Sequence, residues 1–244
     1  MQSPERRVHR VRHELRRRKI HVVDVTQLGE SFVSVTFAGD ELATFVSASF
    51  DDHIKFIFTD TDGETVHRDY TPRRFDPTTR ELTIEFAMHG DGKAAAWAHE
   101  VSVGQQAIVG GPKGSMIVPI DYDWHLLAGD ATALPAINRR LEELPASSRA
   151  FVVVQLENDS DRRTFDGIAN PDVHWVRTCD ELVTTLRALQ LPAGEGFAWA
   201  AGEASMMGQV RTVLVEEKQH PKEAMRVAAY WRKGASDYHE DLTG

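Results

Sequence analysis

The stretch Arg68-Asp69-Tyr70-Thr71-Pro72-Arg73 is the most informative feature of the chain and lies between two strand-like segments in its first third. The planar guanidinium of Arg68 can pair with phosphate oxygens as a fork. The ring of Tyr70 can cover another flat apolar surface, and the hydroxyl of Thr71 can both donate and accept a hydrogen bond. On its own, the stretch is more typical of an arginine-rich strand end followed by a proline turn, so the surrounding pattern has to decide.

Short alternating segments surround this stretch. Strand-like alternation covers residues 21–25, 32–37, 54–58 and 82–86, with turn residues between them. One helix is predicted around residues 92–100. Because a closed sheet leaves no free strand edges, this density of short strands predicts a small antiparallel barrel over residues 19–120.

The pattern of predicted elements changes after Pro119. Apolar segments of strand length follow at residues 124–128, 150–156, 173–176, 197–201 and 226–230, and helical patterns separate them at 131–144, 181–190 and 203–219. Alternation of strands and helices predicts a doubly wound parallel sheet, covered on both faces, over residues 121–234. Residues 235–244 are expected to form a C-terminal tail.

The composition excludes several kinds of site. The 244 residues are 41% hydrophobic and carry a net charge of −9, and no apolar run reaches the roughly 18–20 residues of a membrane span. The charged N-terminus has no apolar segment typical of a secretory signal. The single cysteine, Cys179, excludes an internal disulfide, a four-cysteine zinc site and a cysteine-ligated iron–sulfur cluster. We expect no bound metal, no membrane partner and a cytoplasmic location.

Basic residues gather near the N-terminus. Residues 1–19 hold eight Lys or Arg and two Glu, whereas the rest of the chain is acidic. A basic arm can bind nucleic acid, but no basic patch interleaved with aromatic residues follows it. We therefore predict a solvated arm over residues 1–18 without a nucleic-acid partner. His9 and His13 are too few for a metal site, and no function is assigned to them.

Further stretches follow in a characteristic order. They are Phe50-Asp51-Asp52-His53-Ile54-Lys55, Met88-His89-Gly90-Asp91-Gly92-Lys93-Ala94-Ala95-Ala96-Trp97, Gly110-Gly111-Pro112-Lys113-Gly114-Ser115, Ala128-Gly129-Asp130-Ala131-Thr132-Ala133-Leu134-Pro135-Ala136, Ala201-Gly202-Glu203-Ala204 and Ala229-Tyr230-Trp231-Arg232. With the stretch at 68–73, this ordered set resembles the siderophore-interacting proteins, which are flavin-dependent ferric-chelate reductases of the ferredoxin-reductase superfamily. The resemblance runs from about Arg12 to Trp231, and the best match is the short branch that uses NADPH.

The resemblance implies that the predicted barrel binds FAD. Arg68 would pair with the pyrophosphate, Tyr70 would lie against the isoalloxazine, and Thr71 would hydrogen-bond its reactive N5 edge as a catalytic residue. The start of the predicted helix would hold the pyrophosphate through backbone N–H groups, because a helix N-terminus favours anions. A helix cap without a ligand fits this segment equally well, and Ala95 stands where the family commonly has serine. The further cofactor-binding candidates are Asp69, His89, Gly90, Gly92, Lys93, Ala94 and Ala95.

The second domain would bind the coenzyme. Gly129-Asp130-Ala131-Thr132 follows the first parallel strand, which is where nucleotides bind in such sheets. The resemblance places the catalytic Thr132 where the nicotinamide meets the flavin. Gly202-Glu203 repeats the pattern, although an ordinary helix start fits nearly as well. The cofactor-binding candidates here are Gly129, Asp130, Thr132, Arg162, Arg163, Gly202, Glu203 and Trp231.

The sequence contains residues suited to each of two coenzymes, NADH and NADPH. Glu157 ends the second parallel strand, where an acid can accept the ribose 2′-hydroxyl of NADH. Arg162 and Arg163 follow and could hold the 2′-phosphate of NADPH instead, or form an exposed loop. The family branch favours NADPH, with NADH possible.

The implied function is FAD-dependent, NADPH-driven reduction of ferric siderophores or other ferric chelates, with release of Fe(II). A basic pocket beside the flavin would bind the anionic chelate through Lys55, with Arg232 and Lys233 as further candidates. Two alternatives stay open: a flavin reductase that serves a protein acceptor, and a non-catalytic binder of ferric chelates. The chain has no Walker ending for ATP and no Gly-x-Ser-x-Gly elbow, and no histidine is expected to join Ser and Asp in a hydrolase triad.

Overall fold

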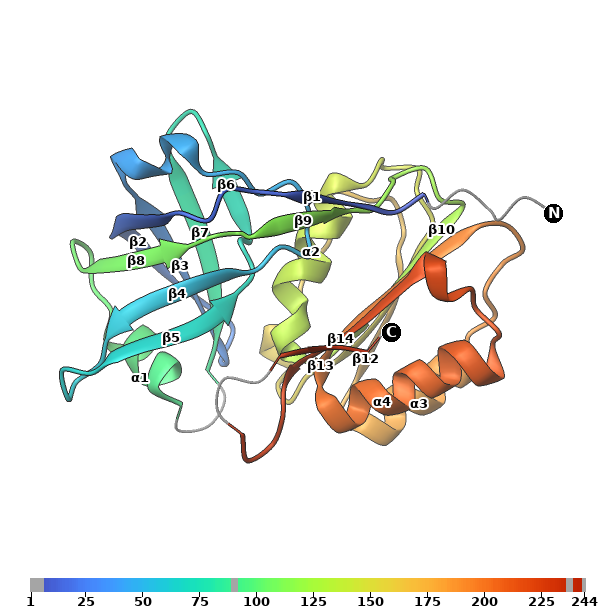
Figure 1. Ribbon diagram of the computed structural model, residues 1–244. Helices are drawn as coiled ribbons and strands as arrows, with labels where there is room; N and C mark the ends of the chain where they lie inside the picture. The colour runs from blue at the N-terminus through green and yellow to red at the C-terminus, as the bar shows by residue number, and fades with distance from the viewer. Residues whose placement is uncertain (1–6, 89–91, 236–238, 243–244) are drawn as a thin grey trace. The chain divides into compact units, whose positions relative to one another are not determined.

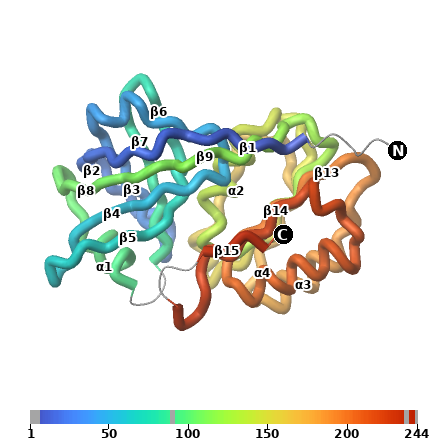
Figure 2. Tube along the Cα trace, viewed as in Figure 1, coloured from blue at the N-terminus to red at the C-terminus, as the bar shows by residue number. Residues whose placement is uncertain are grey.

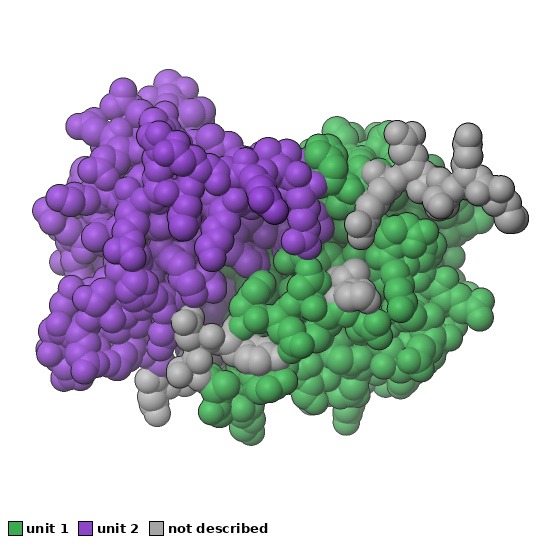
Figure 3. Space-filling view, in the orientation of Figure 1, with its two compact units in different colours: residues 1–9, 118–244 green, residues 10–117 purple. Residues whose placement is uncertain are grey.

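The computed structural model describes residues 7–88, 92–235 and 239–242. The chain divides into two compact units, shown in different colours in Figure 3. Residues 10–117 form one, here the antiparallel unit, and residues 1–9 with 118–244 form the other, here the parallel unit. No helix in the described part of the chain is long and apolar enough to cross a membrane.

The antiparallel unit contains a seven-stranded sheet in the order β5-β4-β8-β2-β3-β7-β6. Its strands are β2 (Arg17–Leu28), β3 (Phe32–Ala38), β4 (Ile54–Thr59), β5 (Thr65–Tyr70), β6 (Arg74–Asp76), β7 (Glu81–Ala87) and β8 (Gln106–Gly110). In Figures 1 and 2 the strands curl around a shared core. Phe56 lies at its centre, and its ring centroid is 4.9 Å from that of Trp97, which comes from α1 (Lys93–Glu100). The expected antiparallel domain is confirmed.

Part of the predicted solvated arm belongs to the folded antiparallel unit. β1 (His9–Arg12) pairs with β9 (Gly114–Ile117) in a small two-stranded sheet. Arg18 lies in β2 and is only 4% exposed, because alternation along the strand turns its side chain inward. Its guanidinium donates to the carbonyl of Gly111 at 3.1 Å and to that of Thr44 at 2.8 Å. Arg18 is therefore part of the folded unit.

The parallel unit is built on a six-stranded sheet in the order β12-β11-β10-β13-β14-β15. The strands are β10 (Trp124–Gly129), β11 (Ala150–Gln155), β12 (Asp172–Val176), β13 (Gly196–Glu203), β14 (Met225–Trp231) and β15 (Glu240–Asp241), and the helices are α2 (Leu134–Glu143), α3 (Cys179–Ala188) and α4 (Ala204–Thr212). β10 to β14 pair in parallel. Figure 1 shows α3 and α4 on one face of the sheet and α2 on the other, which confirms the doubly wound fold.

The C-terminal residues do not form a free tail as predicted. β15 pairs antiparallel with β14, and Arg226 on β14 binds Asp241 with an Nη1–Oδ2 distance of 2.7 Å. The carbonyl of Leu242 accepts a hydrogen bond from Arg211 on α4. The chain thus folds back along the strand that ends at Trp231.

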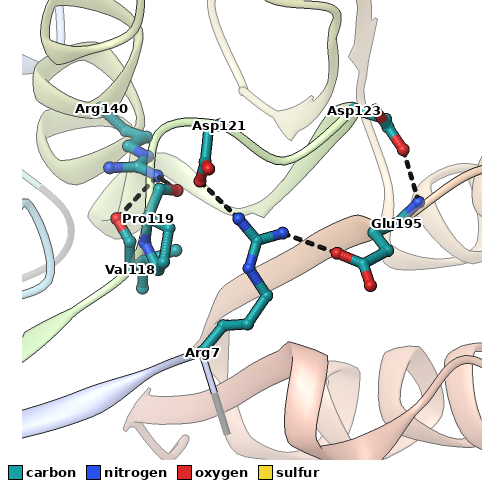
Figure 4. Close-up of polar contacts among 7 residues, drawn as sticks. All are labelled: Arg7, Val118, Pro119, Asp121, Asp123, Arg140 and Glu195. Atoms are coloured by element: carbon teal, nitrogen blue, oxygen red, sulfur yellow. Dashed lines mark hydrogen bonds and ion pairs between the residues drawn. The ribbon is translucent and has the colours of Figure 1, made fainter. Parts of the chain in front are cut away.

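Two arginines fasten the chain where it enters the parallel unit (Figure 4). The buried Arg140 donates to the carbonyls of Val118 and Pro119 at 3.2 and 2.8 Å. Burial lowers the pKa of Arg140 to about 10, so the guanidinium remains charged at neutral pH. Arg7 binds Asp121 and Glu195 at 2.5 and 2.7 Å. These contacts explain why Arg7 clusters with the parallel unit.

Candidate functional site

The stretch at 68–73 begins inside a strand, not between strands as predicted. Arg68 and Tyr70 lie at the carboxyl end of β5, opposite Phe56 and Ile54 of β4. Residues directly opposite in an antiparallel pair share a face, so both side chains lie on the core face of the sheet. The ring of Tyr70 is 4.5 Å from that of Phe86, and burial raises the pKa of its hydroxyl, which stays a neutral phenol. The next residue, Thr71, is 7% exposed.

The guanidinium of Arg68 is half-buried and donates from Nη1 to the neighbouring carbonyl of His67 at 2.7 Å. This contact uses one donor of a group that carries several in a fixed fork. The remaining donors can meet an anion, as the sequence predicted for a pyrophosphate.

The start of α1 is suited to an anionic group. Gly92 is its N-cap and provides no side-chain cap, and the first turn carries no acidic residue. A Cβ atom built at Gly92 would meet no atom of the described residues within 4 Å, so a ligand can approach the backbone closely there. The first N–H groups of a helix lack partners within it, which leaves those of Lys93, Ala94 and Ala95 to bind an anion. These donors fit the pyrophosphate of FAD.

Two of the predicted residues in this segment, His89 and Gly90, lie outside the described residues. The side chain of Lys93 is paired within the antiparallel unit. Its ammonium binds Asp60 at 2.6 Å and Glu64 at 2.7 Å, both from the turn between β4 and β5, and these carboxylates raise its pKa. Lys93 can therefore contribute its backbone N–H but not a free charge.

Lys55 and Asp69 form a pair on the other face of the hairpin. They are direct cross-strand neighbours, and Lys55 Nζ lies 2.9 Å from Asp69 Oδ2. Both side chains remain about one-third exposed. Alternation along β5 puts them on the face opposite to Tyr70. The structure thus joins two predicted site residues to each other and places neither on the same face as the tyrosine.

Asp130 organises the carboxyl edge of the parallel sheet. The residue follows β10 and is only 8% exposed. Its Oδ1 accepts hydrogen bonds from the N–H and the hydroxyl of Thr132, and its Oδ2 accepts from the N–H of Glu203 and the indole of Trp231. The structure therefore brings together four predicted cofactor-binding residues, Asp130, Thr132, Glu203 and Trp231. The hydrogen bonds that join them use polar groups that were predicted to contact the coenzyme.

Gly129 and Gly202, the two predicted glycines at the carboxyl edge of the parallel sheet, allow chain segments to pack closely against each other. A Cβ at Gly129 would lie 2.1 Å from the carbonyl oxygen of Ala201, and a Cβ at Gly202 would lie 2.6 Å from Asp130 Oδ2. Protein atoms occupy the space that the absent side chains leave. This differs from Gly92, where no part of the chain that the structure describes lies within 4 Å of the Cβ position.

Glu203 caps a helix. Its Oε2 accepts hydrogen bonds from the backbone N–H groups of Ser205 at 2.6 Å and Met206 at 3.1 Å, at the start of α4. The alternative of an ordinary helix start therefore describes this carboxylate better than a coenzyme contact does.

The loop after β11 gathers the predicted arginines and adds one. Asp159 binds Arg162 at 2.7 Å and Arg177 at 2.5 Å through the same oxygen. Arg163 donates to the carbonyl of Asp161 at 3.0 Å. Arg177 was missed, although it directly follows β12 and so belongs to the same carboxyl edge as Glu157, whose carbonyl it also contacts. A single carboxylate oxygen is thus shared by two guanidinium groups.

The structure also brings together a histidine, a serine and an aspartate, which the sequence did not predict. His13 Nε2 lies 2.7 Å from Ser115 Oγ, and that hydroxyl donates to Asp52 Oδ2 at 2.8 Å. The hydroxyl lies between imidazole and carboxylate, and Ser115 is 3% exposed. A hydrolase triad instead places the histidine between the other two with an accessible hydroxyl. The cluster is structural.

Comparison with known proteins identifies the family. The chain is 32% identical to the "NADPH-dependent ferric-chelate reductase" of Escherichia coli K12, over 95% of this chain and 99% of that protein. The chain belongs to the siderophore-interacting protein family. The family model described as "Siderophore-interacting protein" matches residues 122–234, and that described as "Siderophore-interacting FAD-binding domain" matches residues 21–67 and 59–116.

Other members of the siderophore-interacting protein family agree with this assignment. The "Ferric vibriobactin reductase ViuB" of Vibrio cholerae is 26% identical over 88% of this chain and 89% of that protein. The crystal structure of a siderophore utilization protein from T. fusca superposes with a TM-score of 0.90 at 30% identity, covering 95% of this chain and 98% of that one. The predicted family and fold are confirmed, and the antiparallel unit is a siderophore-interacting FAD-binding domain.

Proposed function

We propose that this chain is an FAD-dependent reductase that uses NADPH to reduce ferric siderophores or other ferric chelates and releases Fe(II). The observation that carries the proposal is the similarity, over nearly its whole length, to an NADPH-dependent ferric-chelate reductase. The open, uncapped start of α1 and the position of Arg68 and Tyr70 at the end of β5 support FAD as the resident cofactor.

Each group of the antiparallel unit has a task in holding FAD. Arg68 and the first N–H groups of α1 bind the pyrophosphate, because both offer donors to an anion. Tyr70 covers a face of the isoalloxazine, and its neutral hydroxyl adds no charge there. Thr71 hydrogen-bonds the reactive edge of the ring. FAD, when bound, supplies an acceptor for the hydride of the coenzyme and can deliver electrons singly to iron.

The ferric chelate is the substrate. Fe(III) is held by hard oxygen ligands, which bind Fe(II) more weakly, so reduction releases the metal. A chelate with anionic ligands is attracted by Lys55, Arg232 and Lys233. The pairing of Lys55 with Asp69 reduces this attraction, because the carboxylate cancels much of the ammonium charge at 2.9 Å.

One preparation tests the proposal. Purified protein should be yellow, lose its colour with NADPH in the absence of oxygen, and turn over steadily on a ferric chelate with no added protein. A colourless protein that binds the chelate would support a non-catalytic binder. Bleaching without chelate turnover would support a reductase for a protein acceptor.

Coenzyme selectivity should depend on the arginines around Asp159. We expect Arg177→Ala, and the double variant Arg162→Ala/Arg163→Ala, to raise the KM for NADPH about tenfold, because each loses a charge-assisted contact to the 2′-phosphate. The KM for NADH should hardly change. Steady-state kinetics with both coenzymes measures this.

A matched control for these variants is Arg187→Ala, which removes an exposed guanidinium of the same unit that pairs with Glu217. It should leave both KM values unchanged. Equal losses with NADPH and NADH in the arginine variants would place these residues outside the 2′-phosphate site.

Lys55→Ala should slow reduction of anionic ferric chelates several-fold, keep the flavin and leave reduction by NADPH normal. The loss should shrink as salt is added, because exposed charges are screened over about 8 Å at physiological ionic strength. Lys55→Arg keeps the charge and should behave like the wild type. If neutral and anionic chelates slow equally, Lys55 has only a structural role.

A further inference from the structure

The carboxylate of Asp130 holds three segments of the parallel unit together. The hydroxyl and N–H of Thr132 lie 2.5 and 2.9 Å from Oδ1. The N–H of Glu203, at the end of β13, lies 2.8 Å from Oδ2, and Trp231 Nε1, at the end of β14, lies 2.9 Å from the same oxygen. These contacts connect the carboxyl ends of β10, β13 and β14, which are consecutive in the sheet.

The geometry leaves little of Asp130 for a ligand. Each oxygen already accepts two hydrogen bonds, and the residue is 8% exposed. Hydrogen bonds to an ionised carboxylate are about twice as strong as neutral ones, so the arrangement is firmly held. Asp130 therefore acts through its neighbours, in contrast to the direct cofactor contact expected from the sequence.

The carboxylate also sets the polarity of Thr132. An ionised carboxylate can only accept, so the threonine hydroxyl must donate its single proton to Oδ1. Its lone pairs are then left to accept a hydrogen bond, and the matching ligand group is an N–H donor. The primary amide of a nicotinamide is such a group.

Trp231 is fixed in a similar way. Its indole N–H is used by Asp130, yet 41% of the residue is exposed. The surface that remains for a ligand is the flat apolar ring. A fixed ring next to a fixed acceptor suits a planar heterocycle that carries an amide.

We propose that Asp130 is the positioning residue of the coenzyme site: it makes the Thr132 hydroxyl an acceptor for the carboxamide and holds the Trp231 ring in place, without touching the coenzyme. This role rests on the proposed use of a nicotinamide coenzyme. Asp130 would determine how fast NADPH reduces the bound flavin, but neither FAD binding nor the later reaction with iron.

Two substitutions isolate the contacts. Asp130→Asn keeps the shape but turns one acceptor oxygen into an NH2 donor. If the NH2 faces Glu203 and Trp231, their N–H groups lose their acceptor; if it faces Thr132, the hydroxyl must accept and the indole bonds to an uncharged oxygen. Trp231→Phe removes the indole N–H and keeps an aromatic ring. The matched control is Asp123→Asn, at the opposite end of β10 and β13. Asp123 directly precedes β10 and accepts a hydrogen bond at 2.8 Å from the backbone N–H of Glu195, which directly precedes β13 (Figure 4).

The first readout is structural and needs no turnover. The chain has five tryptophans, and the indole N–H resonance of Trp231 is the one missing from the nitrogen–proton spectrum of Trp231→Phe. In the oxidised, FAD-loaded protein this resonance should move upfield in Asp130→Asn and stay in place in Asp123→Asn. Titration with NADP⁺ should perturb it in the wild type.

The second readout separates the half-reactions. Asp130→Asn should slow anaerobic bleaching by NADPH about tenfold, in line with the loss of a hydrogen bond to a charged group. After reduction with dithionite, the variant should reoxidise with ferric chelate at the wild-type rate. Asp123→Asn should match the wild type in both reactions. Thr132→Val, which lacks the hydroxyl, should be bleached slowly by NADPH, whereas Thr132→Ser, which keeps it, should be bleached at the wild-type rate.

The proposal is overturned if Asp130→Asn shifts the indole resonance but bleaches at the wild-type rate, or if both half-reactions slow equally. If Asp130→Asn does not fold, Trp231→Phe and Thr132→Val decide, and wild-type bleaching in both rejects the proposal. A wild-type protein that NADPH and NADH fail to bleach would refute the proposed function itself.

Discussion

Replacing Glu85 with alanine should lower the free energy of unfolding by about 3–5 kcal/mol, the usual effect of breaking a buried ion pair. Glu85 lies on β7, and its Oε1 is 3.2 Å from Nε of Arg73, the last residue of the stretch at 68–73. The two side chains are only 6% and 11% exposed. In the variant, the guanidinium of Arg73 stays largely removed from water but loses the carboxylate of Glu85. The cost of desolvating this charge is the reason for the large effect.

Denaturant unfolding at a fixed FAD concentration measures this change, since bound cofactor adds stability by mass action. The double variant Arg73→Met/Glu85→Leu should recover most of the loss, because an apolar pair of similar size removes both charges together. Glu81→Ala, on the same strand but with an exposed contact to Thr79, is the control and should cost little. A loss below about 1 kcal/mol in Glu85→Ala would contradict the expectation and would be typical of an exposed pair.

Elements with strong periodicity were predictable from the sequence. The predicted strand at 54–58 corresponds to β4, and that at 197–201 to β13, because their apolar residues alternate or form an unbroken run. β5 was not predicted as a strand: its sequence Thr-Val-His-Arg-Asp-Tyr has too few apolar residues to show a pattern. β1 and β15 were also missed, since β1 pairs with β9, far along the chain, and β15 has only two residues, Glu240–Asp241.

The site shows the same limit. The types of donor were predictable, because a guanidinium, a hydroxyl and a helix start each have a defined chemistry. Their partners were not, since Lys93 meets Asp60 and Asp130 meets Trp231 only through the fold. Such pairs join residues that lie far apart in the sequence, so no local pattern predicts them.

Arg68→Ala should raise the dissociation constant of FAD ~10–100-fold, because a charge-assisted hydrogen bond to the pyrophosphate contributes roughly 1.5–3 kcal/mol. In this structure Arg68 is half-buried on the core face of β5, and its contact with the carbonyl of His67 leaves further donors of the fork for a ligand. Fluorescence titration of the flavin-free protein with FAD measures the change, and loss of yellow colour on dilution should accompany it.

Arg74→Ala is the matched control, since Arg74 is an exposed guanidinium in β6 of the same unit. It removes the same charge from the unit, so it separates a specific contact from a general electrostatic effect. Tyr70→Phe should retain FAD and Tyr70→Ala should weaken it, because the ring and not the phenol proton covers the isoalloxazine. If Arg68→Ala binds FAD with wild-type affinity, the start of α1 holds the pyrophosphate alone. If Arg68→Ala and Arg74→Ala lose equal affinity for FAD, net charge attracts the cofactor, and not the guanidinium fork at the end of β5.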